Sequence, residues 1–290
     1  MKGRRRVYAL VSAGTVLAAG TFGAAGAVAT QAPEISAKGG YVMNDGSGEE
    51  LFSKSADTRR STGSTTKVMT AKVVLEQKNL DLDKKVTIQK AYSDYIVGKT
   101  GSSARLIVGD KVTVRQLLYG MMLPSGCDAA YALADTYGSG ASRSARVKSF
   151  IGKMNDEAGE LGLKNTNFDS FDGIGNGANY STPRDLTKLA SSAMQNPTFR
   201  DVVQTKSVKE KVDTKNGGYR YMEWENTNSL LSTYQGTLGI KTGSGPASGY
   251  SLVFAAERNG KTVAGTVLGA PSAGKRTADA KRLLDDAFEG

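Results

Sequence analysis

A serine and a lysine in one short segment could together attack a carbonyl carbon. Ser64 and Lys67 are separated by two threonines, and residues three apart lie on the same side of a helix. Lys67 can therefore reach the Ser64 hydroxyl. A lysine that is partly buried, or near another cation, loses its proton more easily and can act as a base. The pair predicts a serine nucleophile activated by an amine. The same spacing at 272–275 is interpreted as surface helix.

A second hydroxyl group lies in the segment Ser125-Gly126-Cys127, which stands between Pro124 and an expected helix. Taken alone, this segment is typical of a helix cap followed by a buried thiol. It gains a chemical meaning only together with the first segment and with a third one near the C-terminus.

The third segment runs from Lys241 through Thr242 and Gly243 to Ser244, at the end of an expected strand. Because Gly243 has no Cβ, a substrate can lie close against this backbone. The amine and the two hydroxyls offer several donors to a carboxylate. The segment therefore predicts a binding site for an anionic substrate end. Another Lys-Thr-Gly at 99–101 lies in a polar stretch and is interpreted as loop.

Composition excludes several classes of site. The chain has no histidine, which rules out a Ser-His-Asp triad and the usual zinc sites. Its single cysteine, Cys127, cannot form an internal disulfide. We expect no metal and no cofactor. The net charge is +10, but the basic residues are scattered and form no stripe with aromatic residues, so nucleic-acid binding is not expected.

The elements that must position these residues can be read from periodicity and turn signals. Thr182, Pro183 and Asp185 are typical of a capped helix start. The expected helices are 68–77, 112–123, 128–137, 143–161, 183–195 and 277–288, and the expected strands are a hairpin within 39–57 and the runs 237–241, 250–257 and 262–268.

Strands thus lie towards both ends of the chain, and helices fill the middle. This pattern predicts an α/β (α+β) fold in which an antiparallel sheet, built from both chain ends and flanked by helices, carries an inserted all-helical lobe. We expect the sheet lobe at about 30–66 and 205–290 and the helical lobe at about 67–204. A cleft between the lobes is a natural place for the site.

The N-terminal segment 1–29 is expected to be a secretory signal peptide. A cationic start precedes a mostly apolar run from Val7 to Val28, and Ala27-Val28-Ala29 is a small-x-small cleavage site. The mature domain would then begin at Thr30. The alternative is a permanent membrane anchor, because the apolar run is long enough to span a bilayer.

In this order the three segments match the signature of class A β-lactamases and penicillin-binding proteins. The sequence resembles the serine-type D-alanyl-D-alanine carboxypeptidase/transpeptidase family, the low-molecular-weight penicillin-binding proteins, over nearly the whole mature chain. Family-like stretches also occur at 59–60, 161–168 and 180–185. The resemblance implies a β-lactamase/transpeptidase-like fold and cleavage of the terminal D-Ala-D-Ala bond of peptidoglycan stem peptides.

The resemblance also implies a role for each residue. Ser64 would form an acyl-enzyme with Lys67 as base, and Ser125 would pass a proton to the departing D-alanine. The backbone N–H groups of Ser64 and Ser244 would form the oxyanion hole. The residues implied in substrate binding are Cys127, Lys241, Thr242, Gly243 and Ser244.

One position departs from the family pattern. Cys127 stands where the family usually has asparagine, and a thiol is a weaker donor and acceptor than an amide. The chain resembles the Cys-bearing subset, similar to exported actinomycete DD-transpeptidases, which implies transfer to an amine acceptor ahead of water and acylation by β-lactams. We expect an exported protein at the cell wall or the outer membrane face, with loose membrane association left open. Nothing in the sequence indicates an oligomeric state.

Several alternatives remain open at this point. A β-lactamase would need a base for its deacylating water, and the stretch from Glu160 to Asn165 is one residue too long for the usual pattern. A wall-binding module with decayed chemistry would bind peptide without an acyl-enzyme. Cys127 as nucleophile lacks an imidazole partner. The glycines at 173–177 are interpreted as a turn-rich loop. Arg184 either touches a substrate carboxylate or serves the fold.

Overall fold

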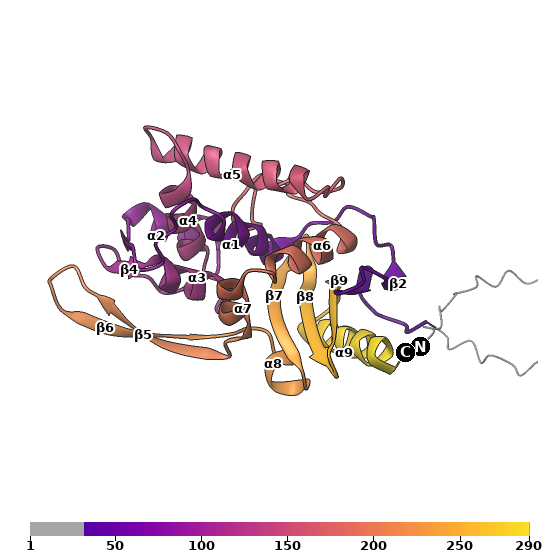
Figure 1. The fold of residues 1–290 in the computed structure, drawn as a ribbon. Coiled ribbons are helices and arrows are strands. Elements are labelled where there is room, and N and C mark those ends of the chain that lie inside the picture. The colour runs from indigo at the N-terminus through magenta and orange to yellow at the C-terminus, as the bar shows by residue number, and fades with distance from the viewer. Residues whose placement is uncertain (1–31, 290) are drawn as a thin grey trace, which may run out of the picture. The chain divides into compact units, whose positions relative to one another are not determined.

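A five-stranded antiparallel sheet is the centre of the computed structural model, which describes residues 32–289 (Figure 1). The strand order is β2-β1-β9-β8-β7, so β7 forms one edge. Every helix and strand that the structure describes lies in the unit Ile35–Gly290. The five strands are β1 (Gly39–Asn44), β2 (Glu50–Lys54), β7 (Thr237–Gly245), β8 (Gly249–Arg258) and β9 (Lys261–Ala270).

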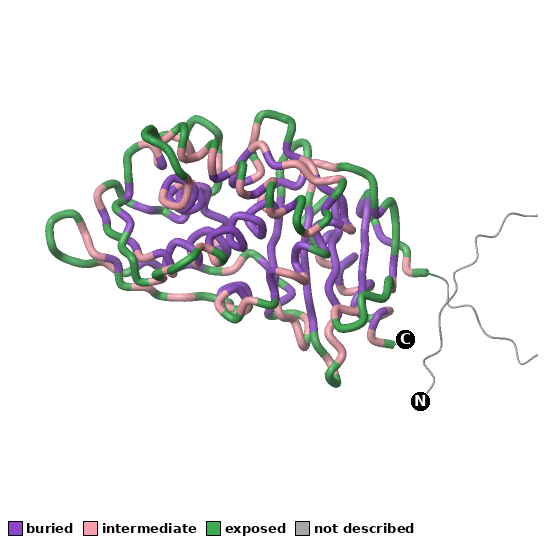
Figure 2. The backbone as a smooth tube through the Cα atoms, turned by 45° about the horizontal axis from the view of Figure 1, so that its top comes forward, coloured by how far each residue is buried: buried purple, intermediate pink, exposed green. Residues whose placement is uncertain are grey.

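Both faces of this sheet are covered, because successive side chains of a strand point to opposite faces. On β8, Leu252 and Phe254 pack in one cluster with α9 (Ala273–Glu289). Val253 and Ala255 of the same strand belong to the core shared with α6 (Pro183–Ala193) and the helical lobe. The strand therefore reads as an unbroken apolar run, which is typical of burial on both sides. Figure 2 shows these strands as buried along most of their length.

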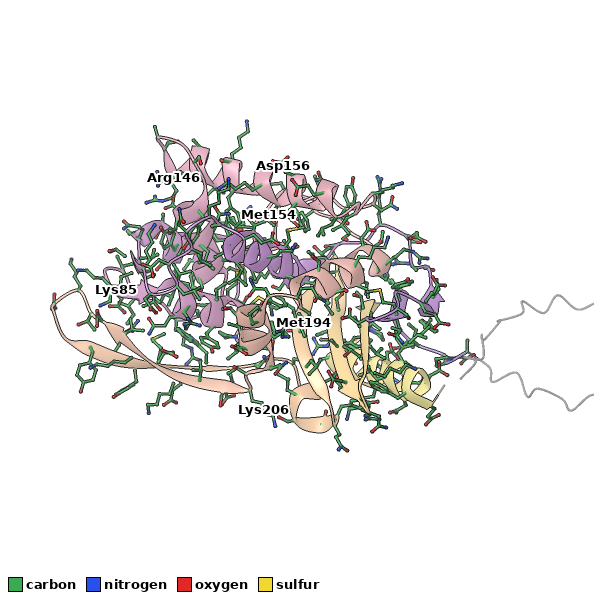
Figure 3. All side chains as sticks on the ribbon, viewed as in Figure 1. Lys85, Arg146, Met154, Asp156, Met194 and Lys206 are labelled. Atoms are coloured by element: carbon green, nitrogen blue, oxygen red, sulfur yellow. The ribbon has the colours of Figure 1, made fainter. Side chains whose placement is uncertain are left out.

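The helical lobe surrounds one helix that is buried on all sides, α1 (Lys67–Leu75). A single 3-10 turn, η1 (Gly63–Thr66), leads into α1 from the sheet side. Figure 3 shows Met154 and Met194 within the fold and Asp156 and Lys206 at its surface. The other helices of this part are α2 (Lys90–Lys99), α3 (Val114–Met122), α4 (Cys127–Tyr137), α5 (Arg143–Glu160) and α7 (Pro197–Gln204).

The expectation of an all-helical lobe is wrong, because a second antiparallel sheet of order β3-β4-β5-β6 lies among these helices. The expected helix 112–123 begins only at Val114, since Thr113 ends a strand and forms a capping box with Gln116. Two of the strands are three residues long, too short to show a period. The missed strands are β3 (Lys85–Thr87), β4 (Lys111–Thr113), β5 (Ser207–Asp213) and β6 (Tyr219–Glu225), and the missed helices are α2, α7 and the short α8 (Leu230–Thr233).

The fold class itself is confirmed: a mixed α/β molecule with an antiparallel sheet built from both chain ends and flanked by helices. The predicted cap is also present, because Thr182 accepts a hydrogen bond from the Asp185 amide at the start of α6. The expected signal peptide lies outside the described residues. Among residues 32–289, no helix is both long and apolar enough to span a bilayer. The lobe boundaries stay a prediction.

Candidate active site

Ser64 and Lys67 meet at the start of α1. Gly63 adopts a φ of +51° and turns the chain into η1, so Ser64 stands half-exposed on the turn. One turn later Lys67 is fully buried, and its Nζ lies 2.8 Å from Ser64 Oγ. The three-residue spacing thus gives the contact that it predicts. A nucleophile open to solvent is held against an amine that solvent cannot reach.

The other neighbours of Lys67 are neutral. Its Nζ lies 3.4 Å from Ser125 Oγ, 3.4 Å from Cys127 Sγ and 3.3 Å from the main-chain carbonyl of Asp172. Among the described residues, none of its hydrogen-bond contacts is a carboxylate oxygen. Ser125 itself has a φ of +69°, which fixes its hydroxyl over the lysine at the cost of a strained backbone. The lysine can therefore exchange a proton with either serine.

Cys127 begins α4 and is buried. Its Sγ contacts Lys67 and lies 3.5 Å from the Ser102 hydroxyl. Burial raises the pKa of the Cys127 thiol, and the nearby positive charge of Lys67 offsets only part of that effect. The sulfur is therefore held as a thiol, which is a poor nucleophile.

The edge strand β7 brings the third segment to the opposite wall. Gly243 packs against the nucleophile turn, since a Cβ there would lie 2.9 Å from the Thr62 carbonyl oxygen. Lys241 is 1% exposed, and its Nζ has no hydrogen-bond partner. Burial holds the pKa of Lys241 well below its usual range, and the positive charge of Lys67 lowers it further. The hydroxyl of Thr242 is 2.6 Å from that of Thr227.

A turn-rich loop at 169–179 closes the back of the site, as its glycines predict. Gly173 has a φ of +90°, and a Cβ there would lie 1.8 Å from the Gly63 carbonyl oxygen. Asn179 donates to the hydroxyls of Thr62 and Thr66 at 2.6 and 2.9 Å. The loop thereby fixes the turn that carries the nucleophile and presents the Asp172 carbonyl to Lys67.

A cleft of about 480 Å³ lies between β7 and the helical lobe. Six of the eight predicted site residues line it: Ser64, Ser125, Cys127, Thr242, Gly243 and Ser244. The other two, Lys67 and Lys241, are buried and do not line it. Sequence reasoning missed Gly101, Ser102, Ile174, Thr227, Tyr250 and Arg276, which also line this cleft.

Arg276 is the most informative of the missed residues. It projects from α9, is only 8% exposed, and its Nε has no hydrogen-bond partner. Burial lowers the pKa of its guanidinium. Nothing in the sequence predicts that an arginine on an amphipathic C-terminal helix would line the cleft. Only the packing of α9 beneath β8 and β9 puts it there.

Three other sequence interpretations can be placed. The Lys-Thr-Gly at 99–101 ends α2 and continues as loop, yet Gly101 touches the cleft. Arg184 bonds Glu50 and Asp57 at 2.7 and 2.8 Å, so it serves the fold. Glu160 is exposed at the end of α5 and lines no part of the cleft. Within 32–289, no cluster of acidic residues and Cys127 has the arrangement of a metal site.

Comparison with known proteins gives one consistent answer. A family model described as D-alanyl-D-alanine carboxypeptidase matches residues 26–272. A D-alanyl-D-alanine carboxypeptidase of Streptomyces sp. strain K15 is 65% identical over 99% of both chains. DacA of Escherichia coli is 32% identical over 88% of this chain and 62% of its own length. The crystal structure of the Streptomyces K15 DD-transpeptidase matches with a TM-score of 0.89 and 68% identity, covering 90% of this chain and all of that one.

Proposed function

The chain belongs to the D-alanyl-D-alanine carboxypeptidase family, and from that premise we propose that Ser64 is the nucleophile of its acyl-transfer reaction. The protein is a serine-type D-alanyl-D-alanine carboxypeptidase/transpeptidase. Members of this family act on D-Ala-D-Ala peptides of peptidoglycan and bind penicillins. The observation that carries the assignment of Ser64 is its 2.8 Å contact with a buried lysine amine.

In the first half of the reaction, Ser64 Oγ attacks the carbonyl carbon between the two D-alanines. Lys67 takes the hydroxyl proton, the C–N bond breaks, and Ser125 passes a proton to the departing amine of D-alanine. The short distances from Lys67 to both hydroxyls support this relay. The backbone N–H groups of Ser64 and Ser244 would hold the oxyanion. The Ser244 backbone packs against Gly63, next to the nucleophile.

The terminal carboxylate of the substrate would lie at the β7 side of the cleft. Lys241 and Arg276 are two buried basic side chains, each with a nitrogen that lacks a hydrogen-bond partner among the described residues. Thr242 and Ser244 add hydroxyl donors on the same wall. A carboxylate bound here would supply the partners that these two buried nitrogens lack, which explains why the fold retains them.

In the second half, an amine or a water attacks the acyl-enzyme. We propose that transfer to an amine outruns hydrolysis, because Cys127 replaces the amide that could otherwise help to position water. Its sulfur already contacts Lys67 and Ser102 and is a weak partner for a water molecule. The natural setting of this reaction would be outside the cytoplasmic membrane, at the cell wall, with loose attachment to the membrane surface left open.

Intact-protein mass spectrometry with benzylpenicillin tests the assignment of Ser64. We expect a long-lived adduct in the wild type and in Cys127→Ala, and none in Ser64→Ala. An adduct that persists in Ser64→Ala would refute the assignment. A short-lived adduct with continuous loss of penicillin would instead indicate a β-lactamase, and no adduct in any variant would indicate a binding module without chemistry.

A further inference from the structure

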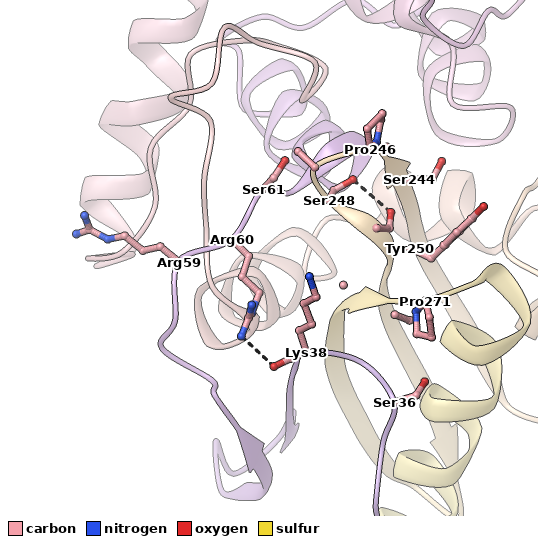
Figure 4. Close-up of a pocket in the computed structure, with 15 residues that line it drawn as sticks. Ser36, Lys38, Arg59, Arg60, Ser61, Ser244, Pro246, Ser248, Tyr250 and Pro271 are labelled. Atoms are coloured by element: carbon pink, nitrogen blue, oxygen red, sulfur yellow. Dashed lines mark hydrogen bonds between the residues drawn. The ribbon is translucent and has the colours of Figure 1, made fainter.

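A second cavity, of about 830 Å³, lies beside the cleft at the β7–β8 turn (Figure 4). It shares two lining residues with the cleft, Ser244 and Tyr250. Its floor is built by the segment before β1, by the loop at 59–61, and by the end of β9. No residue that the catalytic proposal uses lines it except Ser244.

The charged residues that line this cavity are all basic. Lys38, Arg59 and Arg60 line it, and no lining residue is acidic. Figure 4 shows Lys38 extending into the cavity, whereas Arg59 points away from it. The stem of Lys38 packs on Gly269, where a Cβ would lie 3.2 Å from the lysine side chain. Among the described residues, the Lys38 ammonium has no hydrogen-bond or ion-pair partner, so it is available to a ligand.

Arg60 completes the basic end of the cavity. It donates from Nη2 to the Lys38 carbonyl at 2.9 Å, while its buried Nε has no partner. Asp279, which does not line the cavity, accepts hydrogen bonds from the hydroxyl of the lining residue Ser36 and from the Ala37 amide, both at 2.8 Å. Nothing within the lining therefore neutralises the two cations, and the cavity favours an anion.

The position of the cavity suggests which anion. In acyl transfer, the amine that attacks the acyl-enzyme takes the place left by the departing amine, because the two half-reactions mirror one another. On the proposed function, D-alanine leaves from the Ser244 end of β7, which is where the second cavity begins. An acceptor longer than one amino acid would extend from the cleft past Ser244 into this space.

We infer that this cavity is the acceptor subsite and takes the carboxylate end of a peptide amine. The inference rests on the proposed function. The acceptor nitrogen forms a bond to the acyl carbon, the bond from that carbon to Ser64 Oγ breaks, and the amine proton returns to Ser64 Oγ through Lys67. Throughout this step Lys38 and Arg60 hold the remote carboxylate and so fix the direction of approach.

The test measures transfer from a donor peptide ending in D-Ala-D-Ala to three acceptors: glycine, triglycine and triglycinamide. Glycine is short enough for its carboxylate to use the cleft cations, whereas triglycine alone can reach the second cavity with a carboxylate. We expect the wild type to prefer triglycine over triglycinamide by about fivefold, as for a partly exposed charged contact. Added salt should reduce this preference, because Lys38 is exposed.

Lys38→Gln should abolish the preference for triglycine, and Lys38→Glu should reverse it towards triglycinamide. The matched control is Lys148→Gln on α5, which removes the same charge from an exposed position outside both cavities and should keep the wild-type preference. Equal use of triglycine and triglycinamide by the wild type would overturn the subsite. So would the same loss of preference in Lys38→Gln and Lys148→Gln.

Acylation by benzylpenicillin in the same preparations separates the two proposals. Absence of any acyl-enzyme would overturn the proposed function and the subsite with it. Normal acylation, followed only by hydrolysis whichever acceptor is present, would overturn the subsite and leave the role of Ser64 standing.

Discussion

At the scale of single residues, the buried lysine on β7 destabilises the fold. Lys241 is enclosed, has no hydrogen-bond partner, and lies near the positive charges of Lys67 and Arg276. Such a group opposes folding, since a buried polar group without a hydrogen-bond partner is unfavourable. Its retention is explained by the carboxylate that would bind beside it.

Lys241→Met should therefore separate stability from activity. Removing the unsatisfied amine while keeping its length should stabilise the fold by about 1–3 kcal/mol. Cleavage of a D-Ala-D-Ala peptide should fall by roughly tenfold or more, because the carboxylate loses a charged partner. Thermal unfolding and kcat/KM measure the two effects. A variant that loses stability as well as activity would contradict this account.

The same lysine should leave a signature in the pH dependence of stability. Its pKa is lowered in the folded state, whereas an unfolded lysine has a pKa of about 10.4. Between these two values the unfolded chain binds a proton that the folded chain does not, so stability falls as the pH falls below about 10. Comparing the slope of unfolding free energy against pH in wild type and Lys241→Met isolates this contribution. Identical slopes would argue against it.

The pKa of the Cys127 thiol is shifted upwards, in contrast to that of Lys241, and this gives a separate prediction. Burial raises the pKa of its thiol, so the folded protein should react with iodoacetamide only at a higher pH than the urea-unfolded chain, in which a free cysteine has a pKa of about 8.5. The rate of alkylation against pH, followed by mass, gives both midpoints. A folded midpoint below the unfolded one would instead identify an activated cysteine.

Whether the sequence predicts a contact between two site residues depends on whether they lie within one local pattern. Ser64 and Lys67 are three residues apart, so the sequence predicts their contact. Residues from distant segments, such as Ser125 and Lys241, are joined to them only through the family resemblance. Arg276 and Tyr250 carry neither signal, because their place in the cleft follows from how α9 and β8 pack.

At the scale of elements, the loop at 169–179 acts as a brace on the nucleophile turn. Gly173→Ala should force this loop away from Gly63, because the new Cβ would overlap the carbonyl oxygen. Gly177→Ala is the matched control, since Gly177 also has a positive φ but nothing lies within 4 Å of its Cβ position.

Both variants should lose about 1–2 kcal/mol of stability from the backbone strain. Gly173→Ala should lose about a further 1–3 kcal/mol from overpacking and should acylate more slowly with penicillin, while Gly177→Ala should not. Urea unfolding and the acylation rate measure these effects. Equal acylation rates in the two variants would mean that the loop does not position Ser64.

Elements could be predicted where they are long or strongly patterned. The long α5 and the capped start of α6 lie where their periodicity and caps indicate. The sequence pattern does not predict the second sheet. β3 and β4 are too short to show alternation. In β5 and β6 exposed residues alternate with half-buried or buried ones, but charged residues such as Glu210 and Arg220 also lie on the less exposed face. The apolar alternation is therefore weak.

At the scale of the whole molecule, the core joins the two lobes. Ile240, Val253 and Leu268 of the sheet belong to the same cluster as the buried helix α1. A single tryptophan, Trp224, lies on the far sheet of the helical lobe, where its Nε1 donates to the Ala104 carbonyl at 2.8 Å. Its fluorescence therefore reports on the packing of that sheet within the shared core.

Leu284→Ala tests whether the lobes unfold together. Leu284 is fully buried between α9 and the main sheet, in a different cluster from the one that contains Trp224. The substitution should cost about 2–5 kcal/mol and should shift the urea transitions of Trp224 fluorescence and far-UV circular dichroism by the same amount. Separate transitions would show that the lobes are independent folding units.

The position of β7 at the end of the strand order has a further consequence. An unfinished sheet edge is ordinarily an aggregation hazard that proteins cover or shorten. Here Thr242, Gly243 and Ser244 of that edge line the cleft, so an extended peptide lying along them would act as a temporary sixth strand. Main-chain pairing of this kind is indifferent to side chains. Selectivity would then depend on the position of the peptide's carboxyl terminus, so the enzyme would recognise the end of its substrate and not its sequence.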